Sequence, residues 1–245
     1  MKCILCNHLD TQLFYRENQK KYYKCPKCSL IFLDSKNYLS NKDERIRYEQ
    51  HQNFVDDEKY IQFLSKLFIP LKERLSNHKE GLDFGCGPGP ALAKMFNDAG
   101  YIMDVYDPYF FPNETIFSKP YDFISCTEVL EHVFDPAKVI FDLNKILKKD
   151  GWLGIMTNFY DENIDFASWY YRKDPTHVAF YSKETLTNIA TSMSWTLEFP
   201  DKNIVLFKKL LCLNHSSVYI GEINEKVFIG NKYDCPTDND LPNAS

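Results

Sequence analysis

Between residues 82 and 156, short apolar runs alternate with patterns typical of helices. Strands are predicted at 82–84, 101–106, 121–126 and 152–156, and helices at 90–99 and 136–148. Two later strands, at 195–199 and 203–207, predict a closing hairpin with an antiparallel edge. Strands that alternate with helices form a parallel sheet covered on both faces. The sequence therefore predicts an α/β fold with a doubly wound, mostly parallel sheet.

Composition agrees with one folded unit and a small appendage. The chain has 245 residues, of which 44% are hydrophobic and 26% are charged, which excludes wholesale disorder. No apolar run approaches the roughly 18 residues of a membrane span, and the first residues lack the apolar core of a signal peptide. We therefore expect a cytoplasmic protein without a membrane partner.

The net charge of −5 argues against a general nucleic-acid binder. The charge is nevertheless uneven, because residues 1–47 contain ten basic and five acidic residues. A short basic stretch is usually a solvated surface, although it can also be an interaction surface.

Four cysteines near the N-terminus form two C-x-x-C pairs, Cys3 with Cys6 and Cys25 with Cys28. In a cytosolic chain this spacing favours a zinc site over disulfides, with redox pairs or unconnected thiols as the alternatives. Four thiolates leave no open coordination position, so we expect a structural zinc ion. The segment between the pairs suits a β-hairpin, and residues 31–33 suit a short strand.

The chain divides into four parts. We predict a zinc-binding β module at 1–35, a helical connector at 36–79, the α/β domain at 80–210, and a C-terminal extension at 211–245 that is partly a loose tail. Residues 48–79 have one apolar helical face, and Pro70 is expected to kink or split that helix.

A glycine-rich loop, Gly85-Cys86-Gly87-Pro88-Gly89, follows the first strand of this domain. It departs from the dinucleotide pattern G-x-G-x-x-G, because position 90 is proline. Such a loop lets the backbone approach a ligand beside a helix N-terminus that favours an anion. Asp107 ends the next strand, where its carboxylate suits a ribose diol, although capping an Asp-Pro turn is the alternative. Together these features indicate an adenosine ligand.

The chain resembles the class I S-adenosylmethionine-dependent methyltransferases in three places: the run Leu82-Asp83-Phe84-Gly85-Cys86-Gly87-Pro88-Gly89, Asp107, and the run Glu128-Val129-Leu130-Glu131-His132-Val133. The resemblance covers about residues 80–208. With the zinc-binding module at 1–35 as a zinc-ribbon-like head, the chain is also similar to sugar C-methyltransferases. Those enzymes carry a large further C-terminal domain where this chain has residues 211–245. Asp174-Pro175-Thr176-His177-Val178 resembles an element of quinone-pathway O-methyltransferases.

The resemblance implies a Rossmann-like domain that binds S-adenosylmethionine and releases S-adenosylhomocysteine. The glycines would bend under the methionine part, Asp107 would hold the ribose, and Tyr106 or Pro108 would flank the adenine. Cys126 and Thr127 would line the wall near the sulfonium, and Asp83 would orient the loop or the amino group. The implied cofactor-binding residues are Asp83, Gly85, Cys86, Gly87, Gly89, Tyr106, Asp107, Pro108, Cys126 and Thr127.

Methyl transfer requires that the nucleophile, the methyl group and the sulfur lie in line in a site that excludes water. It requires a base only if the nucleophile is still protonated. His177 is the preferred base and His132 the second candidate, while capping, packing or loop ordering are the alternative roles. Residues 157–182 are rich in aromatic side chains and predict either an acceptor wall or a hydrophobic lid or dimer patch. The candidate acceptor contacts are Trp169, Arg172 and Tyr181; Tyr48 and His51 are candidates for a second lid.

The favoured function is methyl transfer to an oxygen, nitrogen or carbon atom of a small-molecule acceptor. One alternative is RNA methylation, with the zinc head gripping the nucleic acid through its charge and its aromatic residues. Another is a non-catalytic adaptor that combines a zinc ribbon with a cofactor-binding domain. A homodimer is compatible with the sequence.

Overall fold

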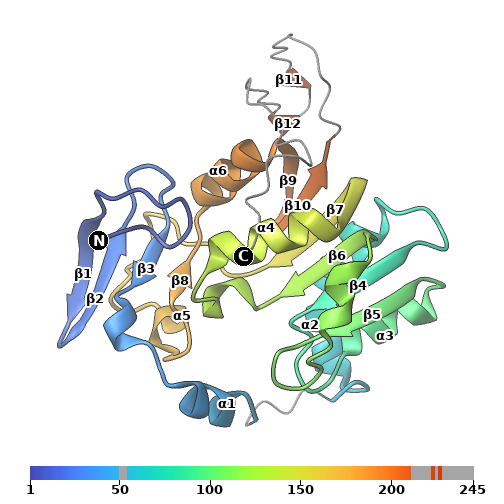
Figure 1. Cartoon of the computed structure of the whole chain (residues 1–245), viewed down its shortest axis with the longest axis horizontal. Coiled ribbons are helices and arrows are strands. Elements are labelled where there is room, and N and C mark those ends of the chain that lie inside the picture. Colours follow the sequence, from blue (N-terminus) through green and yellow to red (C-terminus); the bar gives the residue numbers. More distant parts are fainter. Residues whose placement is uncertain (50–53, 211–221, 224–225, 228–245) are drawn as a thin grey trace, which may run out of the picture.

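The computed structural model describes residues 1–49 and 54–210, and the backbone of two short strands, β11 (Glu222–Ile223) and β12 (Lys226–Val227) (Figure 1). His51 and most of the predicted C-terminal extension lie outside the described residues. Within the described ranges, no helix is long and apolar enough to cross a membrane.

The main sheet has six strands in the order β5-β4-β6-β7-β10-β9. The first four are parallel, and β10 runs antiparallel to both β7 and β9. This confirms the predicted doubly wound sheet with an antiparallel final hairpin. The strands are β4 (Glu80–Phe84), β5 (Ile102–Tyr106), β6 (Tyr121–Thr127), β7 (Leu147–Met156), β9 (Trp195–Asp201) and β10 (Ile204–Lys209).

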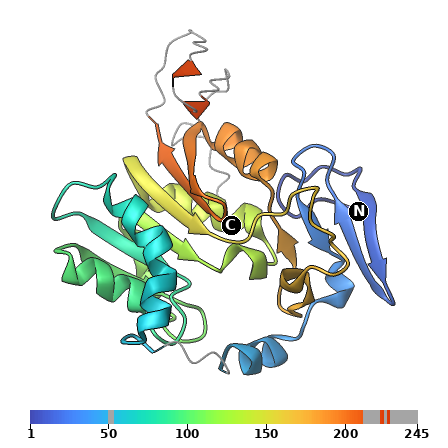
Figure 2. The ribbon, with the colours of Figure 1, turned by 180° about the vertical axis from the view of Figure 1, so that it is seen from behind.

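Helices cover both faces because apolar side chains alternate along the strands. Phe123 and Leu206 pack on the face of α2 (Glu58–Lys72) and α3 (Ala91–Asp98). Their neighbours Ile124 and Phe207 pack on the opposite face, with α4 (Pro136–Ile146) and α6 (Lys183–Met193). Figure 1 shows the face that carries α4, and Figure 2 the face that carries α2.

The helix predicted at 48–79 is wrong in its bounds. The structure has α1 (Asn41–Glu49) and then α2, which begins only after Asp57. The Asp57 carboxylate accepts hydrogen bonds from the backbone N–H groups of Lys59 and Tyr60, so it caps a new helix there. Pro70 lies inside α2, which continues to Lys72. The remaining short helices are η1 (Ser35–Asn37), η2 (Glu114–Ser118), η3 (Leu130–His132) and α5 (Tyr170–Lys173).

The N-terminal hairpin and strand were predicted correctly, but their sheet has a fourth member from far along the chain. β1 (Gln12–Glu17), β2 (Lys20–Lys24) and β3 (Ile31–Leu33) are joined by β8 (Ala179–Phe180) in an antiparallel sheet. Ile31 pairs with Phe180, and Phe32 with Ala179. Figure 1 shows β8 in gold beside the blue N-terminal strands. The head is thus hydrogen-bonded to the segment that precedes α6.

An aromatic cluster fills the space between the head and residues 159–181. The ring of Phe166 lies at its centre, with ring centroids 5.2 Å from Phe14, 5.6 Å from Tyr15 and 5.2 Å from Tyr22. These contacts are edge-on, the arrangement that aromatic quadrupoles prefer. The aromatic composition of this segment therefore stabilises its contact with the head.

Arg172 is buried against the same cluster. Its guanidinium lies 5.1 Å from the ring centroid of Tyr15 and donates to both carboxylate oxygens of Glu17, at 3.0 and 3.2 Å. It also donates to the backbone carbonyl oxygens of Phe166 and Ala167, at 2.9 and 2.6 Å. These five interactions occupy the guanidinium that was predicted to contact the acceptor.

Candidate active site

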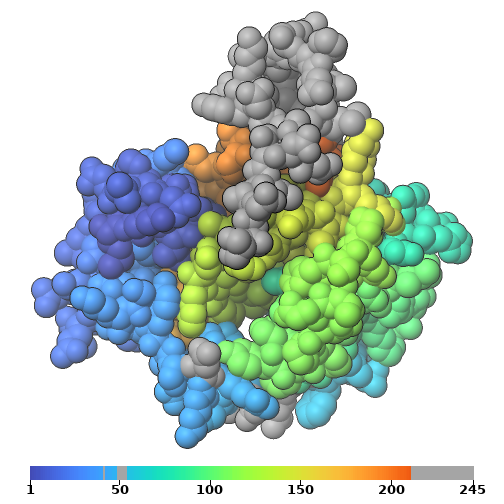
Figure 3. Space-filling model, viewed as in Figure 1, coloured from blue at the N-terminus to red at the C-terminus, as the bar shows by residue number. Residues whose placement is uncertain are grey.

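A cavity of about 570 Å³ lies where the carboxyl ends of β4, β5 and β6 meet, and α1 covers it. In Figure 3 the surface is hollowed between the light-blue residues of α1 and the green residues of the sheet domain. The site residues predicted from the sequence that line this cavity are Gly85, Cys86, Gly87, Tyr106, Asp107, Pro108, Thr127, His132 and His177. The fold therefore brings four separate segments together at one place.

The glycine loop turns sharply at the end of β4. Gly85 has a φ of +75° and Gly87 a φ of +64°, a region where other residues are strained. A Cβ on Gly85 would lie 2.3 Å from a methyl carbon of Val129. At Gly87 none of the described residues beyond its chain neighbours places an atom within 4 Å of that position. The backbone at Gly87 is thus open to the cavity, whereas Gly85 packs against Val129.

Asp107 connects this loop to the end of β5. One carboxylate oxygen accepts from the backbone N–H of Gly87 at 3.1 Å. The other accepts from the N–H groups of Tyr109 and Phe110, at 2.8 and 3.1 Å. The residue therefore orders the turn after β5, as the capping alternative predicted, and it also lines the cavity. The oxygen that accepts from Gly87 keeps one lone pair for a ligand hydroxyl.

Three other predicted cofactor residues are not among those that line the cavity: Asp83, Gly89 and Cys126. Asp83 is buried in β4, accepts a hydrogen bond from the Ser125 hydroxyl at 2.8 Å, and has its pKa raised by burial to about 6. Cys126 is fully buried, which raises the pKa of its thiol. Both side chains lie within the sheet, behind the loop.

The predicted acceptor contacts Trp169, Arg172 and Tyr181 do not line the cavity either. Trp169 lies 5.9 Å from the ring of Phe180, and the hydroxyl of Tyr181 donates to the backbone oxygen of Leu130 at 3.2 Å. These side chains belong instead to the packing between the head and the sheet domain.

His132 and His177 do lie together at the cavity, with ring centroids 4.6 Å apart. Nδ1 of His132 lies 3.3 Å from the backbone oxygen of Thr176, and Nδ1 of His177 lies 2.7 Å from that of Tyr171. Burial lowers the pKa of His132 to about 4. The two candidate bases are thus neighbours, although 44 residues separate His132 from Thr176.

A buried acid beside the histidines was missed as a site residue. The Glu131 side chain is fully buried and accepts hydrogen bonds from the hydroxyls of Tyr171, at 2.5 Å, and Thr157, at 3.0 Å. Glu131 directly precedes His132 in the run Glu128-Val129-Leu130-Glu131-His132-Val133, which is the signal that could have identified it. The adjacent Glu128 has a φ of +50°, and burial together with the nearby Glu131 raises its pKa.

α1 contributes the wall opposite the glycine loop. Glu44 accepts hydrogen bonds from the hydroxyls of Tyr109, at 2.6 Å, and Tyr48, at 3.1 Å. The Tyr48 ring lies 5.4 Å from that of His132. The sequence analysis considered Tyr48 as a lid residue but missed Glu44, because its contact with Tyr109 spans 65 residues.

The cavity wall retains two unsatisfied polar atoms. The hydroxyl oxygen of Thr127 and one carboxylate oxygen of Glu128 are buried and have no hydrogen-bond partner in the described part of the chain. Buried polar atoms without partners are rare, so a polar ligand is expected to meet them. These two atoms, the exposed loop backbone and the Asp107 carboxylate together suit a ligand that consists of a nucleoside with a charged tail.

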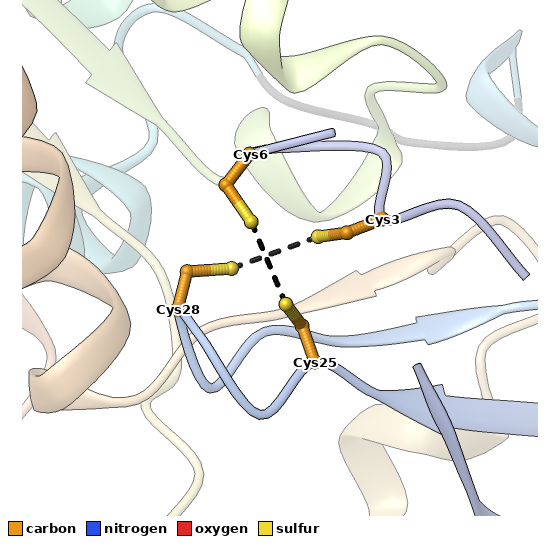
Figure 4. Close-up of side chains that lie close together, drawn as sticks. All are labelled: Cys3, Cys6, Cys25 and Cys28. Carbon is orange, nitrogen blue, oxygen red and sulfur yellow. Dashed lines mark hydrogen bonds between the residues drawn. The ribbon is translucent and has the colours of Figure 1, made fainter. Parts of the chain in front are cut away.

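The four N-terminal cysteines converge at one point (Figure 4). The Sγ atoms of Cys3 and Cys28 are 3.6 Å apart, and those of Cys6 and Cys25 are 3.5 Å apart. A tetrahedron with Zn–S bonds of about 2.3 Å has edges of roughly 3.8 Å. Asn7 and Ser29, each with a φ of +59°, close matching turns after the two pairs. This donor set and spacing fit a zinc ion.

Solved structures with a similar arrangement include three methyltransferases. 1,6-didemethyltoxoflavin-N1-methyltransferase from Burkholderia thailandensis, bound to 1,6-didemethyltoxoflavin and S-adenosylhomocysteine, is 11% identical over 81% of this chain and 99% of that chain, with a TM-score of 0.49. Human N-acetylserotonin methyltransferase, in complex with S-adenosylmethionine, is 15% identical over 60% of this chain and 52% of that chain, with a TM-score of 0.47. The chain thus spans about half the length of the human enzyme.

Magnesium protoporphyrin IX methyltransferase from Synechocystis PCC 6803, with bound S-adenosylhomocysteine, is 13% identical over 69% of this chain and 94% of that chain, with a TM-score of 0.43. No curated protein matches this chain. The family model described as Methyltransferase domain matches residues 48–197, which is more than half of the 245 residues. The matched region contains the glycine loop, Asp107 and both histidines. The chain therefore belongs to this methyltransferase family and is an enzyme.

Proposed function

We propose that this methyltransferase uses S-adenosylmethionine as donor and transfers the methyl group to a small-molecule acceptor. The observation that carries the proposal is a single cavity with two different walls. One wall has the glycine loop and Asp107, and the other has the imidazoles of His132 and His177. When bound, S-adenosylmethionine supplies an electrophilic methyl carbon on a sulfonium. The protein then has to hold an acceptor in line with that carbon and exclude water.

On the donor wall, the loop backbone would hold the methionine part of the donor. Asp107 would accept a hydrogen bond from a ribose hydroxyl, since the carboxylate oxygen that faces Gly87 keeps a free lone pair. Thr127 would donate a hydrogen bond near the sulfur, because its buried hydroxyl oxygen has no partner among the described residues. Tyr106 and Pro108 flank Asp107 and line the cavity where the adenine would lie.

On the acceptor wall, the two imidazoles would promote loss of a proton from the acceptor. A carbonyl oxygen only accepts hydrogen bonds, so each Nδ1 that faces one carries the proton. Each Nε2 then has a lone pair that can interact with an acceptor hydroxyl or amine. His177 remains the preferred group, because its shorter hydrogen bond to Tyr171 holds its ring more firmly.

The packing of the head favours a small molecule over RNA. Phe14, Tyr15 and Tyr22, which would stack on bases, instead contact Phe166. We further propose that Cys3, Cys6, Cys25 and Cys28 bind a structural zinc ion, since four sulfur ligands leave no position for a substrate.

Calorimetry with S-adenosylmethionine tests the donor wall. Asp107→Ala should weaken donor binding at least about tenfold, which is about 1.4 kcal/mol. Asp98→Ala is the matched control, because Asp98 is an exposed acid paired with Lys94 on α3. Equal donor affinity for the Asp107 variant and the wild type would count against the assignment.

Transfer of radiolabelled methyl to fractionated metabolite extracts tests the acceptor wall. His177→Asn retains an amide N–H for the Tyr171 carbonyl but removes Nε2, so donor binding should persist while turnover falls at least about tenfold. Unchanged turnover would remove His177 from the catalytic residues.

A further inference from the structure

The two imidazoles of the acceptor wall lie close to the buried carboxylate of Glu131. Glu131, His132 and His177 each offer one ligand atom, and these three atoms lie within 4.8 Å of one another. Two of the residues come from η3 after β6, and the third comes from the segment that leads into β8. The backbone N–H of Val178 donates to the Glu131 carbonyl oxygen at 2.7 Å, which ties the two segments together.

Both imidazoles are held in the orientation of metal ligands. A histidine that binds a metal almost always donates its other ring N–H to a carboxylate, a carbonyl or water. Here the Nδ1–H of His132 faces the Thr176 carbonyl and that of His177 faces the Tyr171 carbonyl. The lone pairs on both Nε2 atoms are therefore available to a ligand at the cavity.

No basic side chain among the described residues forms an ion pair with the Glu131 carboxylate. The Glu128 carboxyl lies within hydrogen-bonding reach of it, and the neutral hydroxyls of Tyr171 and Thr157 donate to it. Each oxygen accepts one of these hydrogen bonds and keeps one further lone pair. Nearby, a buried oxygen of Glu128 has no hydrogen-bond partner among the described residues. Buried carboxylates are usually paired with a cation or coordinate a metal, so this corner is suited to a cation.

Building on the proposed function, we propose that Glu131, His132 and His177 bind a divalent first-row transition metal ion beside the acceptor. Two imidazoles and one carboxylate suit such ions and leave coordination positions open, as catalytic metal sites do. An acceptor hydroxyl that occupies an open position loses its proton to solvent more readily, because the ion stabilises the resulting oxyanion. The site therefore favours an acceptor with a hydroxyl group at the atom that is methylated.

Binding of Mn²⁺ to the full-length protein, with its structural zinc retained, tests the site by electron paramagnetic resonance. Mn²⁺ prefers oxygen and nitrogen ligands, so it does not compete for the four cysteines. We expect one bound Mn²⁺ per chain. His132→Asn and His177→Asn keep a side-chain N–H for the facing carbonyls but remove the ligand nitrogen, so each should weaken Mn²⁺ binding at least about tenfold. Glu131→Gln should act in the same direction.

His78→Asn is the matched control, because His78 is exposed and has a φ of +59°, which asparagine tolerates. It should bind Mn²⁺ as the wild type does. Circular dichroism verifies folding, and the two histidine variants keep the test decisive if Glu131→Gln does not fold. No Mn²⁺ binding at millimolar concentration, or equal binding by the histidine variants, would overturn the inference.

Donor calorimetry on the same samples separates the two proposals. If S-adenosylmethionine binds and Mn²⁺ does not, the metal site is wrong and the proposed function stands. If Mn²⁺ binds with the expected dependence on His132 and His177 but the donor does not bind, the metal site stands and the proposed function fails.

Discussion

Arg172→Ala is the substitution that most directly probes how the head supports the active site. The side chain joins β1 to the segment that carries His177, and its relative exposure is only 3%. Its guanidinium donates to Glu17 on the head and to the carbonyl oxygens of Phe166 and Ala167. Removing it therefore breaks interactions on both sides of the contact at once.

The expected loss of stability comes mainly from the two carbonyl oxygens. A buried acceptor that loses its donor costs about 1–3 kcal/mol, and the contact of the guanidinium with Tyr15 and Tyr22 adds roughly 0.5–2 kcal/mol. Taken together, the unfolding free energy should fall by about 3 kcal/mol or more. For a chain of this size that corresponds to a melting temperature about 6–12 °C lower.

Thermal unfolding followed by circular dichroism measures this effect. Arg16→Ala is the control, because Arg16 is an exposed arginine on the same hairpin and should change stability by no more than about 0.5 kcal/mol. In the folded Arg172 variant, turnover should fall more than donor affinity, since His177 is held by the Tyr171 carbonyl next to Arg172. Equal melting temperatures for the Arg172 and Arg16 variants would refute the reasoning.

Three further outcomes are expected. Burial raises the pKa of Asp83 to about 6 from an ordinary 3.8, so the protonated side chain contributes fully to stability below pH 3.8, and this contribution is lost as the pH rises to about 6. In denaturant titrations, the unfolding free energy of Asp83→Asn should gain roughly 1–3 kcal/mol over that of the wild type between pH 4 and pH 7. A difference that stays constant with pH would contradict this. Elemental analysis should find zinc lost from Cys25→Ser, with a lower melting temperature, whereas a folded head with its full zinc content would exclude the four-cysteine site. Gly85→Ala should destabilise the fold more than Gly87→Ala, because only at Gly85 does the new Cβ meet Val129, and equal melting temperatures would argue against that contact.

Much of the sheet domain could be predicted from the sequence, because its determinants are local. Strand and helix periodicity repeats within a few residues, and Gly85, Gly87 and Asp107 lie at the ends of adjacent parallel strands. The C-x-x-C pairs likewise carry their ligand geometry in short turns. Helix boundaries were less accessible, since the apolar face of α2 does not mark where the helix begins and the cap at Asp57 does.

The partners of residues 159–181 depended on tertiary structure. Composition alone allowed an acceptor wall, a lid or a dimer patch for these aromatic residues, and the pairing of β3 with β8 turned them toward the head. In the same arrangement Arg172 binds Glu17 on the head and does not line the cavity, and His177 lies beside His132 and Glu131. Local periodicity determines which residues form a strand or helix, whereas contacts between distant segments depend on how the whole chain packs. His132 and Thr176, which are 44 residues apart, meet at the acceptor side of the site, and Glu17 and Arg172, which are 155 apart, join the head to the segment behind it.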